Sequence, residues 1–381
     1  MSSSQMFLNG LVQWLDFVGL TTLVGGLAFR CLIVQPALLS RQEFESFERH
    51  LRRVEAGSIV LVALTSAANL ILRTLMMSKG MLGDLVAALP VVLQQTHFGA
   101  VWIARISLIG LLGAAWLLRR RGASRLLWST GVSLFGATFV ALTTSLSGHA
   151  ADWGDLTVPV LMDWLHLLAI STWAGGLFTL GFVLRASLVP PDKEKKVQGL
   201  AAIARRFSRM AACCAAGFLV AGLYNTWIQV TSLSPLFTTS YGRTLLMKLS
   251  LVLLVLMIAA INRYYFLALL GGSSGAPNQV IVRTIGRFAG TVLTGNAGRE
   301  DEKIRQQFFR SVRLEWLVAA GALAFTALLT QFPPARHIRS HQHREEHALH
   351  QPTHGRAMER WSLLGRQPGS EFPLDRTGRS W

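Results

Sequence analysis

Residues 161–184 read LMDWLHLLAISTWAGGLFTLGFVL, and within this stretch only Asp163 and His166 carry ionisable side chains. As an α-helix the stretch would be about 36 Å long, enough to cross the hydrocarbon core of a bilayer, which is about 30 Å thick. It lacks the strict alternation of apolar and polar residues that is typical of a barrel strand. The stretch therefore predicts a transmembrane helix.

Similar apolar runs recur along the whole chain. Together with 161–184 there are eight such runs, at about residues 10–34, 55–77, 98–118, 126–147, 161–184, 210–230, 244–262 and 314–332. The chain is 51% hydrophobic and only 15% charged, with a mean hydropathy of +0.40, and these values argue against a water-soluble domain. We therefore predict an all-α integral membrane protein with eight transmembrane helices.

Basic residues outnumber acidic ones by 37 to 20, which gives a formal net charge of +17. Such an excess is also typical of nucleic-acid-binding proteins, so the positions of the basic residues along the chain have to separate the two interpretations. Connections after odd-numbered predicted helices hold 23 Lys and Arg, whereas those after even-numbered ones hold only Lys79 and Arg243. Because cytoplasmic loops collect basic residues, this contrast predicts periplasmic termini in a multi-pass bacterial inner-membrane protein, and no nucleic-acid partner.

The sequence also contains an internal repeat. Residues of the first half recur in the second at regular spacing, namely Trp14 as Trp164, Asp16 as His166, and Gly25 as Gly175. We predict one four-helix repeat in residues 1–155, a second in 156–335 with a basic cytoplasmic insertion at 263–313, and a His-rich, disordered periplasmic tail in 336–381. An even number of helices per repeat makes the two repeats parallel, as in many transporters.

Ionisable residues inside predicted spans are energetically costly and often functional. Four of them lie at depths that allow one cluster at the bundle centre, as a functional site or as a structural ion-pair network: Asp16, Arg105, His166 and Lys248. Others lie near the ends of predicted helices, where we expect them to reach the interface by snorkelling: Arg30, Arg73 and Glu315.

A second group of polar residues gathers at the predicted outer face. Its candidate metal ligands are His149, His166, Met162, Asp163, His97 and Asp16. Imidazole binds both oxidation states of copper and thioether favours Cu(I), so this set predicts a site for Cu(I) or Cu(II). Taken singly, each histidine can also be a capped or hydrogen-bonded interfacial residue.

On the predicted cytoplasmic side, Met210, Cys213 and Cys214 share i, i+3, i+4 spacing at the start of a helix. Soft sulfur ligands suit Cu(I), so these residues form a candidate exit site. Buried, small apolar packing residues explain the same pattern.

The candidate copper sites suggest copper transport, and two other functions remain open at this point. His97, His149 and His166 are candidate axial ligands for haem b, in a membrane redox protein acting on copper or quinone. A copper sensor or assembly factor that transports nothing is the other alternative. A visible spectrum separates the haem protein from a copper transporter.

Several short stretches follow one another along the chain, among them Ser147-Gly148-His149-Ala150, Asp163-Trp164-Leu165-His166, Trp173-Ala174-Gly175-Gly176, Arg206-Phe207-Ser208-Arg209 and Asn262-Arg263. In their order and spacing they resemble the CopD family of copper-resistance membrane proteins. The resemblance covers about residues 10–335. It implies an inner-membrane copper transporter rather than an enzyme, supplied by a periplasmic CopC-like copper chaperone, with His149 and His166 at the matching histidine positions. The basic insertion and the His-rich tail depart from the family pattern.

Overall fold

The computed structural model describes residues 3–78, 85–120, 127–188, 195–229, 234–270 and 301–332. Within these ranges every regular element is helical, as predicted. In chain order the elements are α1 (Ser3–Leu32), η1 (Pro36–Leu38), α2 (Arg41–Met77), α3 (Leu85–Gln95), α4 (His97–Arg120), α5 (Leu127–Leu146), η3 (His149–Trp153), α6 (Val158–Phe178), η4 (Thr179–Leu184), α7 (Arg185–Ser187), α8 (Lys195–Gln229), α9 (Ser234–Thr238), α10 (Ser240–Ile261), η5 (Asn262–Phe266), α11 (Leu267–Leu270) and α13 (Asp301–Leu329). The segments η4 and η5 are π-helical.

Seven helical segments in the described part of the chain are long and apolar enough to cross a membrane. They are Ser4–Leu32, Arg41–Met77, His97–Arg120, Val158–Ser187, Gly199–Gln229, Ser240–Phe266 and Ile304–Leu329. They correspond to seven of the eight predicted spans, which makes the chain a multi-pass membrane protein. The remaining predicted span, 126–147, corresponds to α5, whose apolar segment Thr130–Leu146 is shorter. An eighth crossing therefore stays a prediction.

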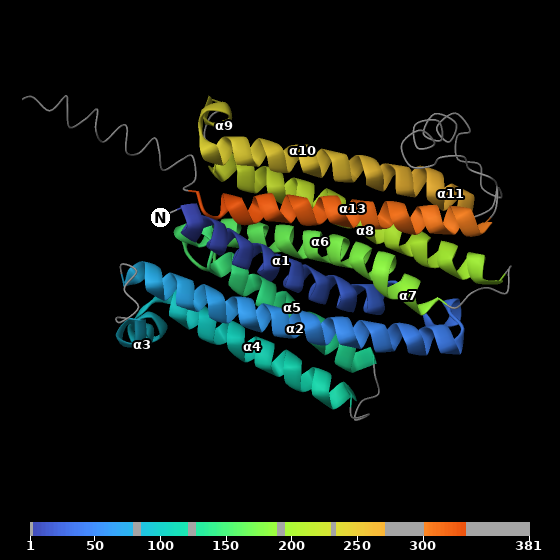
Figure 1. Cartoon of the computed structure of the whole chain (residues 1–381), viewed down its shortest axis with the longest axis horizontal. Helices are drawn as coiled ribbons and strands as arrows, with labels where there is room; N and C mark the ends of the chain where they lie inside the picture. The colour runs from blue at the N-terminus through green and yellow to red at the C-terminus, as the bar shows by residue number, and fades with distance from the viewer. Residues whose placement is uncertain are drawn as a thin grey trace, which may run out of the picture. The chain divides into compact units, whose positions relative to one another are not determined.

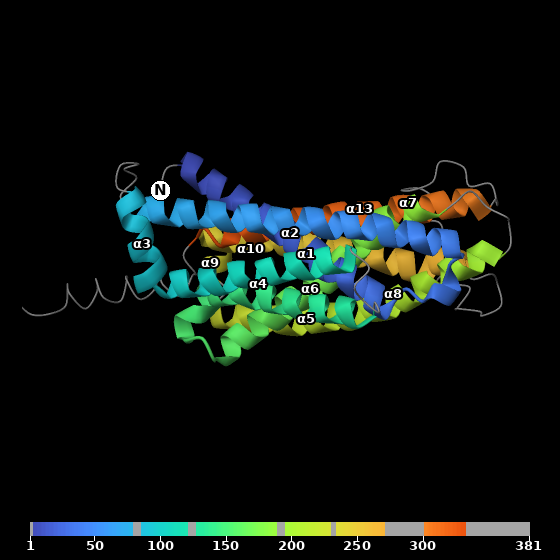
Figure 2. The ribbon, with the colours of Figure 1, turned by 90° about the horizontal axis from the view of Figure 1, so that it is seen from below.

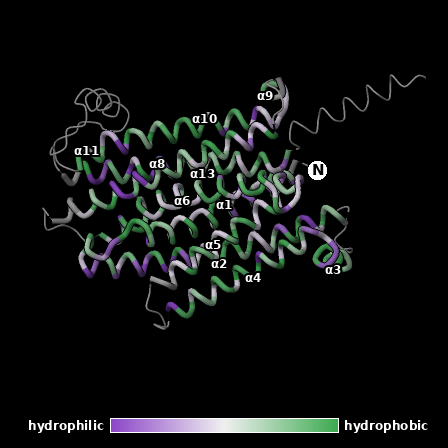
Figure 3. The backbone as a smooth tube through the Cα atoms, turned by 180° about the vertical axis from the view of Figure 1, so that it is seen from behind, coloured by the Kyte–Doolittle hydropathy of each residue, from purple (hydrophilic) through white to green (hydrophobic). Residues whose placement is uncertain are grey.

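The long helices lie side by side, with α1 and α6 between two groups (Figures 1 and 2). One group contains α2, α4 and α5, and the other contains α8, α10 and α13. The N-terminus, α3 and α9 lie at one end of these helices, and α7 and α11 lie at the opposite end (Figure 1). Hydrophobic residues dominate the middle of the helices, and hydrophilic stretches gather toward their ends (Figure 3).

Helix α2 begins well before the apolar run that predicted it at 55–77. Ser40 and Glu43 form a capping box, in which each side chain bonds the backbone N–H of the other residue. This cap satisfies backbone donors at the helix start and favours helix formation in the polar segment that follows. Hydropathy detects only the apolar part of such a helix, so the predicted boundary was too late.

The helices α1 and α6 cross with their backbones in contact. A Cβ atom on Gly25 would overlap the backbone of Gly175, and one on Gly175 would overlap the carbonyl group of Thr21. Small residues at such crossings allow close van der Waals packing between membrane helices. Gly25 and Gly175 are the two glycines that the predicted repeat pairs with each other.

The indoles of the paired tryptophans reach across the molecule in a reciprocal way. Trp14 on α1 donates to the carbonyl oxygen of Ala320 on α13 at 2.9 Å, and Trp164 on α6 donates to that of Thr138 on α5 at 2.8 Å. Each first helix of a predicted repeat thus bonds the last helix of the other. The repeat boundaries stay a prediction, and residues 271–300 of the insertion and the tail 336–381 lie outside the described residues.

Two residues expected to snorkel are buried instead. Arg30 forms an ion pair with Glu48, and Glu315 bonds Asn262 in the protein interior. Arg73 is exposed and lies over the ring of Phe98. The snorkelling interpretation was therefore wrong for Arg30 and Glu315, because distance along the chain from a helix end does not report which way a side chain faces.

Candidate metal site and its polar surroundings

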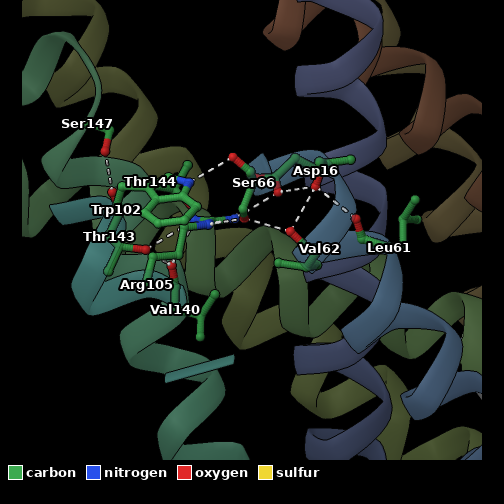
Figure 4. A network of polar contacts seen from close by, with 11 residues as sticks. Asp16, Leu61, Val62, Ser66, Trp102, Arg105, Val140, Thr143, Thr144 and Ser147 are labelled. Atoms are coloured by element: carbon green, nitrogen blue, oxygen red, sulfur yellow. Dashed lines mark hydrogen bonds and ion pairs between the residues drawn. The ribbon is translucent and has the colours of Figure 1, made fainter. Parts of the chain in front are cut away.

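In the first half of the chain, Asp16 and Arg105 form a buried ion pair (Figure 4). The Nη2 atom of Arg105 donates to both carboxylate oxygens of Asp16, at 2.8 Å each. The Thr65 hydroxyl donates to Asp16 Oδ1 at 2.7 Å. Both oxygens of this carboxylate therefore already accept hydrogen bonds from the protein.

The other guanidinium nitrogens of Arg105 are also bonded. Nε donates to Ser66 Oγ on α2 at 2.9 Å, and Nη1 donates to Thr143 Oγ1 and Thr144 Oγ1 on α5 at 3.1 and 2.7 Å (Figure 4). The network joins four helices, because Asp16 lies on α1 and Arg105 on α4. A buried pair with this many hydrogen bonds is well suited to fix helix positions.

In the second half, His166 on α6 is held in one orientation against α8. Its Nδ1 atom lies 2.8 Å from the carbonyl oxygen of Phe218. A carbonyl oxygen only accepts hydrogen bonds, so the ring proton is on Nδ1 and the lone pair is on Nε2. No hydrogen bond from another described residue uses that lone pair. Metal-binding histidines commonly have this arrangement, with one nitrogen anchored and the other available.

Gly222 provides the space for this imidazole. A Cβ atom at position 222 would lie only 2.8 Å from Cε1 of His166 and 3.2 Å from Nδ1. The ring of Phe218 meets the imidazole edge to face, with the ring centroids 6.3 Å apart. One turn of α8 therefore determines how His166 is placed.

A carboxylate and an ammonium group lie near His166. Asp163, one turn before it on α6, accepts a weak hydrogen bond from Asn225 Nδ2 at 3.4 Å and lies within electrostatic reach of His149 and Lys248. Lys248 on α10 also acts electrostatically on His166. The predicted four-residue cluster is thus two groups, with Asp16 and Arg105 in one and His166 and Lys248 in the other.

Two buried oxygen atoms beside Asp163 make no hydrogen bond of normal geometry with another described residue. They are Oδ1 of Asn225 and Oγ of Ser145, although the Ser145 side chain faces the Asp163 carboxyl group as a hydrogen-bond partner. Buried polar atoms are nearly always bonded, so such atoms often mark where a water or an ion binds. Met162, the neighbour of Asp163 on α6, is half-buried.

The other two histidines have carboxylate neighbours of their own. His97 Nε2 lies 2.8 Å from Asp155 Oδ1, with both side chains about half exposed. His149 Nδ1 lies 3.9 Å from Asp152 Oδ2 within η3. In the described part of the chain, no group of three or more His, Cys, Asp or Glu side chains is arranged to hold a metal ion. The predicted ligands therefore do not form one preassembled site, and haem ligation by two of these histidines likewise stays a prediction.

The candidate exit site lies on one helix, α8. Met210 and Cys214 are half-buried and pack against the apolar core, whereas Cys213 is exposed and its thiol is free. Cys31 on α1 is also a free thiol. The positions of these sulfurs fit packing as well as metal binding.

Sequence reasoning missed the polar centre at Glu315. Asn262 Nδ2 donates to Glu315 Oε2 at 2.6 Å, and the Trp173 side chain also hydrogen-bonds this carboxyl group. The sequence did contain a signal for this polar centre, since Glu315 is an acidic residue within an apolar run and Asn262-Arg263 is one of the CopD-like stretches.

Comparisons with known proteins point to copper. Residues 3–158 match the family described as "Copper resistance protein D-like, N-terminal domain", and residues 201–329 match "Copper resistance protein D". Copper resistance protein D of Pseudomonas syringae pv. tomato is 30% identical over 222 residues, which are 54% of this chain and 68% of that protein. No solved structure matches.

Two more relatives are similar over comparable lengths. The copper transport protein CutJ of Bacillus subtilis (strain 168) is 31% identical over 225 residues, which are 57% of this chain but only 40% of CutJ. The inner membrane protein YebZ of Escherichia coli (strain K12) is 25% identical over 242 residues, 63% of this chain and 70% of that protein.

Proposed function

This chain belongs to the copper resistance protein D family, and on that premise we propose that it carries copper across the bacterial inner membrane, from the periplasm to the cytoplasm. The relatives named for copper transport and copper resistance support copper as the cargo. The chain acts as a transporter rather than as an enzyme.

One observation carries the proposal at the level of residues, namely the geometry of His166. The Phe218 carbonyl fixes the Nδ1 proton, Gly222 leaves room for the ring, and the lone pair of Nε2 is available to a metal. Copper accepts such an imidazole nitrogen in either oxidation state.

We call His149, Met162, Asp163 and His166 the outer site. Met162 and Asp163 lie one turn before His166 on α6, and His149 acts electrostatically on Asp163. The buried oxygen Oδ1 of Asn225, which has no hydrogen-bond partner among the described residues, supports a cation there. We leave Asp16 out, because its oxygens are bonded to Arg105, and His97 out, because it pairs with Asp155.

The membrane topology proposed with this function has eight crossings, periplasmic termini and two parallel repeats. The alternation of basic connections supports it, as do the Gly25 and Gly175 contact and the reciprocal tryptophan bonds. A periplasmic CopC-like chaperone would deliver copper to the outer site. Met210, Cys213 and Cys214 would receive Cu(I) at the cytoplasmic side.

Copper binding and uptake by the purified full-length protein in proteoliposomes test the proposal. We expect His166→Ala to weaken copper binding at least tenfold, and His149→Ala together with His166→Ala to abolish uptake. His50→Ala is the matched control, because His50 bonds Ser46 on α2, away from the outer site. Parent-like uptake by the double variant, or a purified protein that contains haem and no copper site, would overturn the proposal.

A further inference from the structure

Glu315 is a carboxylic acid buried in the interior of a membrane protein. It lies on α13 with only 2% of its surface exposed, near the middle of the membrane-spanning segment Ile304–Leu329. Its polar partners are the amide of Asn262 and the side chain of Trp173, and both are neutral. Nothing in the outer site accounts for this residue.

The cations nearest in sequence to Glu315 and Asn262 are bonded elsewhere. Arg313 lies two residues before Glu315, and Arg263 directly follows Asn262. Arg313 Nε donates to the carbonyl oxygen of Gly181 at 3.0 Å, and Arg263 Nη1 donates to the carbonyl oxygen of Ser208 at 2.9 Å. Within the described ranges, no ion pair or electrostatic interaction joins a basic side chain to Glu315.

Charged groups on the other helices that pack against α13 are also paired. On α1, Asp16 pairs with Arg105, and Arg30 pairs with Glu48. On α6 and α10, Asp163 and Lys248 act on each other, and Lys248 also acts on His166. The Glu315 carboxyl group therefore has no counter-cation in the described structure.

This environment favours the neutral acid. Burial without a counter-cation disfavours the charged carboxylate far more strongly than the protonated acid. Asn262 suits either form, because its amide offers an N–H to a carboxylate and a carbonyl oxygen to a carboxylic acid. A carboxyl group beside such a partner can exchange a proton without losing its hydrogen bonding.

Two more buried oxygens near this point have no hydrogen-bond partner among the described residues. They are Oδ1 of Asn262 and Oγ of Ser311. Ser311 lies four residues before Glu315, so the two side chains share a face of α13. Asn262 opens the π-helical segment η5, and such segments occur frequently at functional sites. A proton or a bound water molecule would supply the hydrogen bonds that these oxygen atoms lack.

Packed aromatic rings connect this centre to the outer site. Trp173, which bonds Glu315, stacks on Phe218 with ring centroids 5.1 Å apart and an angle of 13° between the planes. Phe218 in turn accepts the hydrogen bond from His166 through its carbonyl oxygen. A change at His166 can therefore reach the surroundings of Glu315 through two residues.

We propose that Glu315 is a proton-exchange site, which holds a proton in the metal-free protein and releases it when a copper cation moves inward. The O–H bond of the carboxylic acid breaks, the proton leaves to water, and the cation supplies the charge that balances the carboxylate. No electron is transferred in this step. The inference rests on the proposed copper transport, but the protonation of Glu315 is measured without transport.

Infrared difference spectroscopy of the full-length protein in lipid nanodiscs tests the protonation. We expect the carbonyl-stretch band of a buried carboxylic acid in the metal-free protein, its loss in Glu315→Gln, and its weakening when copper is added. Glu48→Gln is the control, because Glu48 is paired with Arg30 and should leave the band unchanged. If the parent protein lacks such a band, the proposal is wrong. If Glu315→Gln does not fold, Asn262→Ala should shift the same band, and an unshifted band would contradict the proposal.

A pH-sensitive dye inside proteoliposomes tests the coupling. We expect about one proton to move for each copper ion taken up, and Glu315→Gln to lose this proton movement while its copper affinity at the outer site stays within twofold of the parent. Copper uptake without proton movement, or uptake that depends on Na⁺ instead of on the pH gradient, would overturn the coupling. If the parent protein takes up no copper at all, the proposed function fails, and the infrared band still decides whether Glu315 is protonated.

Discussion

The two halves of the molecule have different chemistry at the positions that the predicted repeat pairs with each other. In the first half, Asp16 on α1 and Arg105 on α4 neutralise each other in a network in which every polar group is bonded. In the second half, the residues that the predicted repeat pairs with them are His166 on α6 and Lys248 on α10, which are both basic and cannot form an ion pair. The first half therefore uses these positions to hold helices together, while the second leaves the Nε2 lone pair of His166 available.

Helix packing follows the same division. The backbones of α2 and α4 approach closely, and the Trp102 indole on α4 donates to the Ser66 carbonyl oxygen on α2 at 2.8 Å. The backbones of α8 and α10, as far as they are described, do not approach to the same extent. His166 itself is packed tightly against α8, so the looser contact lies between α8 and α10, on the side of Lys248.

Of the substitutions that test this difference between the two halves, Arg105→Met should have the largest effect. It leaves the Asp16 carboxylate buried without its cation, and such changes destabilise proteins by about 3–5 kcal/mol. Thermal unfolding in detergent measures the loss, with Arg120→Met as the control because Arg120 is exposed on the same helix. Adding Asp16→Leu to Arg105→Met should recover part of the stability. A single variant as stable as the control would contradict the structural role of the pair.

Gly222→Ala should weaken copper binding by about 10- to 100-fold, the range expected when the support of a metal-binding histidine is disturbed. The added methyl group would lie 2.8 Å from the His166 ring and push it out of position. Gly217→Ala is the matched control on the same helix, because its methyl group would meet Ala169 at an ordinary 3.7 Å. Equal copper affinities in the two variants would show that His166 is not a ligand of the outer site.

Lys248→Met should strengthen copper binding by about fivefold. Removing a positive charge near His166 relieves repulsion of the incoming cation by on the order of 1 kcal/mol. Isothermal titration with copper measures the change, and Arg243→Met, an exposed position on the same helix, serves for comparison. Weaker binding in Lys248→Met would mean that the ammonium group organises the site instead of opposing the metal.

His97→Ala should have the smallest effect. The pair with Asp155 is about half exposed on both sides, and exposed pairs contribute at most about 1 kcal/mol. We expect the unfolding free energy to fall by less than that amount and the copper affinity to stay within twofold. A tenfold loss of affinity would return His97 to the metal site.

The sequence was enough to predict the helical class, because apolar runs of membrane-spanning length have few other stable structures. It also brought together the residues of both polar groups, since Asp16, Arg105, His166 and Lys248 are the ionisable residues deep within predicted spans. It could not divide them into two pairs, because that depends on the rotation of each helix about its axis. A small rotation of a helix about its axis changes which side chains face each other, and hydropathy does not report this rotation.

Glu315 shows a second limit of sequence reasoning. Its position near the start of an apolar run, 314–332, suggested a helix end, whereas α13 begins at Asp301 and places it well inside the helix. The polar first turns of α13, like those of α2, carry no hydropathy signal. Asn262 was visible only as part of a family-like stretch, and its contact with Glu315 requires the packing of α10 against α13.

The crossing of α1 and α6 at Gly25 and Gly175 has a mechanical consequence. Because main-chain atoms already touch there, lateral pressure from the lipids cannot bring the two helices closer, and there are no side chains to compress. A relative rotation of α1 and α6 about this contact needs no change in the distance between them. A pivot of this kind keeps the distance between the helices constant at the crossing, while the segments on either side of it can change their separation.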